Sequence, residues 1–160
     1  TKTRYYSGVP LYVDKSEGET KVTLVIPGLT VKTRAELLGK TYDTTSGLMY
    51  DSGKPGEKYF ALGYMIEHAG GVNEYAWLLK GKFGIPKEEG ETKTDNVNEK
   101  TLTVEYTAIA TTTQFQLDTN TKSGTKGVYG DQSDTAFKSK YANDDAWFKA
   151  VVTPPAVSAA

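Results

Sequence analysis

The chain has 160 residues, of which 38% are apolar, so it is long enough to bury one hydrophobic core. Its 19 basic and 20 acidic side chains nearly cancel, which gives no electrostatic reason for tight binding to nucleic acid or to an anionic membrane. Cysteine is absent, which excludes disulfides, thiolate metal sites and a cysteine nucleophile, and no apolar run approaches the roughly 20 residues that cross a bilayer. We therefore expect protein partners and no membrane insertion.

Alternating apolar residues near the N-terminus predict a β-hairpin. Residues 9–13 and 22–26 place an apolar side chain at every second position, and a polar stretch separates them. Pro10 cannot donate a ladder hydrogen bond, so we expect the first strand at a sheet edge. The period then becomes helical and predicts a short amphipathic helix at about 31–38, with Thr33 and Glu36 as a capping box and Gly39 beyond its end.

A small exposed hairpin is predicted next, with strands at 41–42 and 48–50 around the turn-rich segment 43–47. Tyr42 and Tyr50 lie there in polar surroundings. Tyrosine serves contact surfaces well, and a contact role and scattered surface tyrosines are equally acceptable interpretations. Tyr5 and Tyr6 are open to the same two interpretations.

Two longer strands follow, at 60–66 and 75–83, each with one alternating apolar face. Tyr75, Trp77 and Phe83 fall on one face of the second strand. Stacking on sugars or bases is conceivable for such aromatics, but strict alternation in an apolar strand favours core packing. Residues 85–98 carry mixed charge without periodicity and predict a long solvated loop, which is often a functional element.

The C-terminal part of the chain is expected to contain strands at 102–108 and 111–117 and a mobile, turn-rich stretch at 118–130. A short helical segment is expected to follow. Ser133 or Asp134 suits a helix cap, and Asp144-Asp145 lead into Ala146-Trp147-Phe148. Pro154-Pro155 end this region. Residues 1–153 are therefore expected to form a single domain, followed by a C-terminal tail at 154–160. Residues 156–160 of this tail are expected to be frayed or to start a linker.

No reaction is indicated by the remaining candidate residues. His68 is the single histidine and falls in a predicted turn, where a solvated side chain is a better interpretation than a general base. Asp131 with Asp134, and Asp144 with Asp145, lack calcium-loop spacing and are better interpreted as helix caps. Neither phosphate-binding glycine motifs nor a nucleophile elbow occur. We expect no enzyme activity, cofactor, metal or small-molecule substrate.

Several motifs, in order along about sixty residues, give the chain a family resemblance. It resembles the major tail proteins of long-tailed bacteriophages, the subunits of the tail tube, in Ala35-Glu36-Leu37-Leu38-Gly39, Met49-Tyr50-Asp51-Ser52-Gly53-Lys54-Pro55, Ala61-Leu62-Gly63-Tyr64, Trp77-Leu78-Leu79-Lys80-Gly81-Lys82-Phe83-Gly84-Ile85-Pro86, Glu88-Glu89 and Glu91-Thr92-Lys93-Thr94-Asp95. The strand at 102–108 and Asp145-Ala146-Trp147-Phe148 are weaker parts of the same likeness.

The resemblance implies a mainly β fold, a β-sandwich or partly closed barrel with a short flanking α-helix and a short C-terminal helical segment. It also implies rings, commonly hexameric, that stack into a hollow tube for DNA passage in the virion, built from subunits made in the bacterial host cytoplasm. The partners would be other copies of the chain, a tape measure protein and a tail terminator. Such proteins begin with an additional N-terminal strand region, which we expect ahead of Thr1.

The exposed hairpin around 44–47 and the long loop at 87–98 are the expected contacts between stacked rings. The expected contact residues are Tyr42, Thr44, Thr45, Tyr50, Lys87, Glu88, Glu89, Glu91 and Lys93. A tube that lets DNA slide should avoid clustered lysine and arginine, so we expect a neutral or acidic lumen. The alternatives are a monomeric cell-surface or adhesion β-sandwich that binds glycan or protein, and a carbohydrate-active enzyme with paired carboxylates. The sequence indicates no such pair of carboxylates, so the enzyme is the least favoured alternative.

Overall fold

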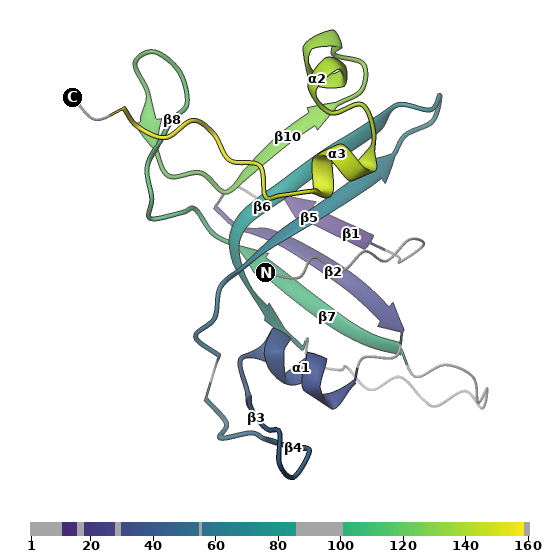
Figure 1. Cartoon of the computed structure of the whole chain (residues 1–160), viewed down its shortest axis with the longest axis vertical. Helices are drawn as coiled ribbons and strands as arrows, with labels where there is room; N and C mark the ends of the chain where they lie inside the picture. Colours follow the sequence, from purple (N-terminus) through teal and green to yellow (C-terminus); the bar gives the residue numbers. More distant parts are fainter. Residues whose placement is uncertain (1–10, 16–17, 28–29, 55, 86–100, 159–160) are drawn as a thin grey trace. The chain divides into compact units, whose positions relative to one another are not determined.

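The computed structural model describes residues 11–15, 18–27, 30–54, 56–85 and 101–158 (Figure 1). These residues form two compact units. One, the hairpin unit, contains the described residues of 11–59 and 82–107. The other, the aromatic unit, contains residues 60–81 and 108–158. The prediction of a single domain over 1–153 stays a prediction.

The hairpin unit contains β1 (Leu11–Lys15), β2 (Thr20–Pro27), α1 (Val31–Leu38), β3 (Thr41–Asp43), β4 (Leu48–Tyr50) and most of β7 (Thr101–Ala108). The sheet order here is β1-β2-β7, and β1 pairs antiparallel with β2 in a register that sets Val13 opposite Val22. The N-terminal hairpin is thus confirmed, whereas Pro10, Tyr5 and Tyr6 lie outside the described residues.

The core of the hairpin unit forms where the alternating residues of β2 and β7 meet. Val22, Val104 and Tyr106 are almost completely buried, as the period-two pattern requires. The ring of Phe83 packs on Tyr106 with centroids 5.0 Å apart. At the exposed side of the same two strands, Lys21 forms an ion pair of 3.8 Å with Glu105. Apolar burial rather than this surface pair stabilises the unit.

The predicted helix at 31–38 is confirmed as α1, but its cap differs from the prediction. The capping residue is Thr30 and not the predicted Thr33. The side-chain oxygen of Thr30 accepts a hydrogen bond from the backbone N–H of Thr33 at 3.2 Å. Thr33 lies inside the first turn, so the capping box with Glu36 does not form. Gly39 does end the helix, in the left-handed conformation at φ 66°.

The aromatic unit contains β5 (Phe60–Glu67), β6 (Asn73–Gly84), β8 (Phe115–Gln116), β9 (Lys122–Ser123), β10 (Gly127–Asp131), α2 (Thr135–Lys140) and α3 (Asp144–Phe148). The end of β6, from Lys82 onward, belongs to the hairpin unit. β6 pairs antiparallel with both β5 and β10, so that Trp77 lies opposite Gly63 on one side and Val128 on the other.

An aromatic cluster forms the core of this unit. Tyr75, Trp77, Trp147 and Phe148 are buried together, and Phe137 and Tyr141 from the α2 region pack against them. Tyr141 meets Trp147 edge-on with centroids 4.9 Å apart. The interpretation of Tyr75 and Trp77 as core residues rather than stacking platforms is confirmed, because their rings are covered by this cluster.

Three predictions for the C-terminal half are wrong in part. The strand expected at 111–117 is reduced to Phe115–Gln116, because the hydroxyl of Thr111 bonds the carbonyl of Thr113 and bends the chain. The stretch 118–130, expected to be turns, contains β9 and most of β10. The expected frayed tail makes a bridge between Ala156 and Phe115, and the N–H of Gln116 donates to the carbonyl of Pro155 at 2.9 Å.

The mainly β class with short helices is confirmed. Of the two architectures left open by the sequence, the β-sandwich agrees better, because the sheets of the described residues do not close into a barrel. No helix among these residues has both the length and the apolar character that crossing a membrane requires.

Candidate functional site

The β3–β4 hairpin brings together four of the predicted contact residues. Its antiparallel register pairs Thr41 with Tyr50, Tyr42 with Met49, and Asp43 with Leu48. Because paired residues share a face and successive residues alternate, Tyr42 and Met49 lie on one face and are half-buried. The other face presents Leu48 and Tyr50 to solvent, 54% and 52% exposed. The hairpin therefore has an inner and an outer side.

The turn of this hairpin is fixed by Asp43. Its carboxylate accepts hydrogen bonds from the N–H of Thr45 at 2.9 Å and from the hydroxyl of Ser46 at 2.6 Å. The N–H of Gly47 donates to the carbonyl of Asp43 at 2.8 Å, with Gly47 at φ 72°. The hydroxyl of Ser46, followed by the backbone of Thr45, holds the pKa of the Asp43 carboxyl below its ordinary value. Asp43 thus stays ionised at neutral pH.

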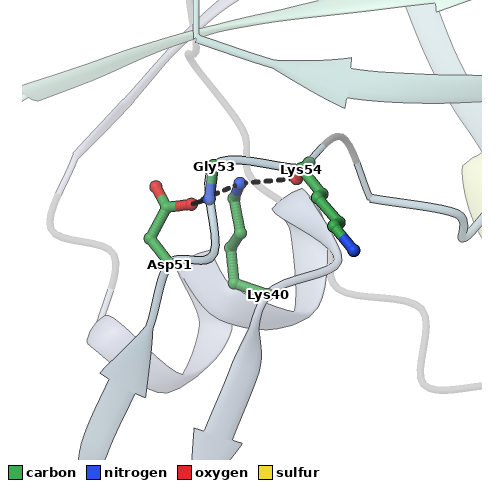
Figure 2. Close-up of polar contacts among 4 residues, drawn as sticks. All are labelled: Lys40, Asp51, Gly53 and Lys54. Carbon is green, nitrogen blue, oxygen red and sulfur yellow. Dashed lines mark hydrogen bonds and ion pairs between the residues drawn. The ribbon is translucent and has the colours of Figure 1, made fainter.

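The base of the hairpin is braced by Lys40, as Figure 2 shows. Its ammonium group lies 2.8 Å from a carboxylate oxygen of Asp51 and donates to the carbonyl of Lys54 at 2.9 Å. The same Asp51 oxygen accepts from the N–H of Gly53 at 2.8 Å. The Lys40 side chain is only 17% exposed, so its charge is better shielded from water than that of a surface lysine. The contact joins the segments before β3 and after β4.

A close backbone approach adds to this brace. A Cβ placed on Gly39 would come within 2.7 Å of the Cα of Gly56, and one on Gly56 would clash with the carbonyl oxygen of Leu38. Only glycine allows the end of α1 to touch the segment after β4 in this way. Figure 1 shows β3 and β4 extending from α1 as a separate two-stranded sheet.

Thr44 and Thr45 are exposed at the tip, as predicted, and Tyr42 faces inward on its half-buried side. Leu48 was missed as a contact candidate, although its position two residues before Tyr50 places it on the same face. Lys87, Glu88, Glu89, Glu91 and Lys93 lie outside the described residues. Whether any of these side chains contacts another copy stays a prediction.

Three of the other candidate residues, His68, Asp134 and Asp144, have structural partners. His68 is exposed, and its Nε2 lies 3.0 Å from a carboxylate oxygen of Glu74, a partner that the sequence did not reveal. Asp134 caps α2 as predicted, accepting from the N–H groups of Ala136 and Phe137. Asn143, not Asp144, caps α3. No group of three or more metal-type ligands occurs within the described ranges.

The β3–β4 hairpin therefore presents a surface of the kind that contacts other molecules. Leu48 and Tyr50 are exposed on one face, Lys40 holds the base in place, and Asp43 carries the one negative charge. Comparison of the chain with protein-family models, with curated proteins and with solved structures found no match in any of the three.

Proposed function

We propose that this chain is a structural subunit that assembles with copies of itself, and that the assembly is the tail tube of a long-tailed bacteriophage. Stacked rings, commonly hexameric, form the conduit through which DNA passes at ejection. The observation that supports assembly is the β3–β4 hairpin, whose outer face exposes Leu48 and Tyr50 while its base is fixed by Lys40. The tail-tube identity rests on the sequence motifs described above.

A braced hairpin suits assembly for an energetic reason. Ordering a flexible segment on binding opposes association, and a segment already held in shape avoids most of that loss. Lys40, Asp51 and Gly53 hold the hairpin base before any partner arrives. Apolar side chains such as Leu48 then add favourable burial on contact, roughly 25 cal/mol per Å² of apolar surface.

The strand arrangement offers a second route to self-assembly. β1 is the outer strand of the order β1-β2-β7 in the hairpin unit, and an outer strand can continue a sheet into a neighbouring copy. A ring needs two different complementary surfaces on every subunit, because its contacts run head to tail. The tube would occur in the virion, with a tape measure protein and a tail terminator as further partners.

The experiment is a concentration series of the chain followed by light scattering after size-exclusion chromatography and by negative-stain electron microscopy. We expect rings or tubes from the unaltered chain and their loss in the double variant Leu48→Ser, Tyr50→Ser. Leu117→Ser is the matched control, because Leu117 is also exposed, at 44%, but lies in the aromatic unit. A chain that stays monomeric throughout the series contradicts the proposal and favours the adhesion module.

A further inference from the structure

The aromatic unit has an open hollow beside α3. It is lined by Tyr141, Ala146, Lys149 and residues 150–153 and holds about 460 Å³. Lys149 is the one charged residue in this lining, and Val151 is 41% exposed. Small-molecule sites are of similar volume, about 300 to 1,000 Å³, but they enclose most of the ligand. An open, mainly apolar hollow is better suited to a protruding side chain of another protein.

The β3–β4 hairpin has the complementary character. Between Thr41 and Tyr50, Asp43 is the one charged side chain, and Leu48 and Tyr50 form the exposed apolar face. The Asp43 carboxyl is ionised at neutral pH, as an aspartate ordinarily is, and its hydrogen bonds from Ser46 and Thr45 lower its pKa further. A carboxylate has about four acceptor positions, so it can accept a further hydrogen bond from an ammonium group. An apolar surface with one negative charge thus matches an apolar hollow with one positive charge.

We propose that the β3–β4 hairpin of one copy docks into the hollow of a second copy, with its apolar face against Val151 and Asp43 facing Lys149. This inference rests on the proposed self-assembly and names the receptor surface for the hairpin. The hairpin and the hollow are different surfaces of the same chain, so the contact is head to tail. Each copy can then give its hairpin to one neighbour and receive the hairpin of another, which produces a ring or an open filament.

The chain lacks cysteine, so single introduced cysteines report this contact directly. Thr45→Cys places a thiol at the exposed hairpin tip, and Thr153→Cys places one in the hollow lining, without altering Leu48, Tyr50 or Val151. The two variants are mixed at the assembling concentration and cross-linked with a short bis-maleimide. Because each chain carries one thiol, a mixed dimer can form only between copies.

We expect several-fold more mixed dimer from this pair than from Thr45→Cys mixed with Thr119→Cys, a matched exposed threonine outside the hollow lining. Adding Lys149→Glu to the Thr153→Cys chain should lower the yield several-fold, and Lys138→Glu should not. Unchanged tryptophan fluorescence shows that the aromatic unit of each variant is folded, since Trp77 and Trp147 lie in its core cluster, and unchanged amide hydrogen exchange over 41–54 shows that the hairpin is retained.

The outcomes separate this inference from the proposed function. Rings or tubes without enrichment of the mixed dimer overturn the hairpin-to-hollow contact and leave the tube function standing. Enriched mixed dimer without rings or tubes supports the contact and contradicts the tube function. Absence of both overturns both.

Discussion

The hydroxyl of Tyr75 donates a hydrogen bond of 2.5 Å to the carboxylate of Asp144, 69 positions later in the chain. Tyr75 comes from β6 and Asp144 from the first turn of α3, so this bond connects the sheet of the aromatic unit to its last helix. The same hydroxyl accepts a weaker bond of 3.3 Å from the amide of Gln132. Trp77 adds a parallel connection, because its indole N–H donates to the carbonyl of Trp147 at 3.3 Å.

Tyr75→Phe should destabilise the aromatic unit by about 1 kcal/mol. A hydrogen bond to a charged group is worth roughly 1.5 to 3 kcal/mol, but Asp144 is exposed and regains water when the hydroxyl is removed. Urea unfolding followed by tryptophan fluorescence measures the change, because both tryptophans lie in this unit. Tyr141→Phe, which removes another hydroxyl from the α2 region, is the control. An equal loss in both variants would argue against a particular role for the Asp144 bond.

Alkaline pH should weaken the fold through its buried tyrosines. Burial raises the pKa of Tyr106 and of Tyr64 above the ordinary value, and burial followed by the bond to Asp144 does the same for Tyr75. The unfolded chain then loses these protons first, at about pH 10, so its free energy falls relative to the folded state as pH rises further. The stabilising contribution is complete below about pH 10 and is lost above it. Urea midpoints at about pH 8 and pH 11, with tyrosinate absorbance, measure this loss; equal midpoints would contradict it.

Local periodicity explains what the sequence predicted correctly. The hairpin of β1 and β2, the helix α1 and the strands β5, β6 and β7 each carry their own repeat of two or of about three and a half residues. The tip of the β3–β4 hairpin was likewise evident from its turn residues. In these segments the local preference and the final packing agree.

Long-range contacts explain which structural features the sequence did not reveal. β10 has the sequence Gly-Val-Tyr-Gly-Asp, which is typical of a turn, yet it pairs with β6 because its glycines permit close approach. A Cβ on Gly130 would clash with the ring of Phe137, and one on Gly127 would lie 3.0 Å from the carbonyl oxygen of Trp77. The hollow at Lys149 was missed for the same reason, since its lining is not marked by any sequence period.

Gly63→Ala should destabilise the aromatic unit by about 1 to 3 kcal/mol, the usual result of overpacking a filled core. A Cβ at this position would come within 2.9 Å of three atoms of the Trp77 ring, which is only 3% exposed and cannot move aside. Gly84→Ala is the matched control in a strand, because a Cβ added there would meet no heavy atom of the described chain within 4 Å. Urea unfolding of both variants should show a loss for Gly63→Ala alone.

Lys40→Met should release the hairpin without unfolding the chain. Its ammonium group holds both the Asp51 carboxylate and the carbonyl of Lys54, and methionine keeps an unbranched side chain, one atom shorter, while removing the donor. We expect amide hydrogen exchange over 41–54 to rise several-fold and assembly to weaken, while tryptophan fluorescence of the aromatic unit stays unchanged. Lys54→Met is the control, because Figure 2 shows its side chain pointing away from Lys40 while its backbone carbonyl is retained.

Acid should have the same effect as Lys40→Met, through the other partner of the brace. The hydrogen bond from Lys40, followed by that from the N–H of Gly53, lowers the pKa of the Asp51 carboxyl. A lowered folded pKa means that the contribution is present above the ordinary aspartate value of about 3.9 and is lost as pH falls through the folded pKa. Exchange at 41–54, corrected for the intrinsic effect of pH, should therefore rise below about pH 4 in the unaltered chain. In Lys40→Met this rise should be smaller, since the main cause of the shift is already removed, and an identical rise would contradict the role of Lys40.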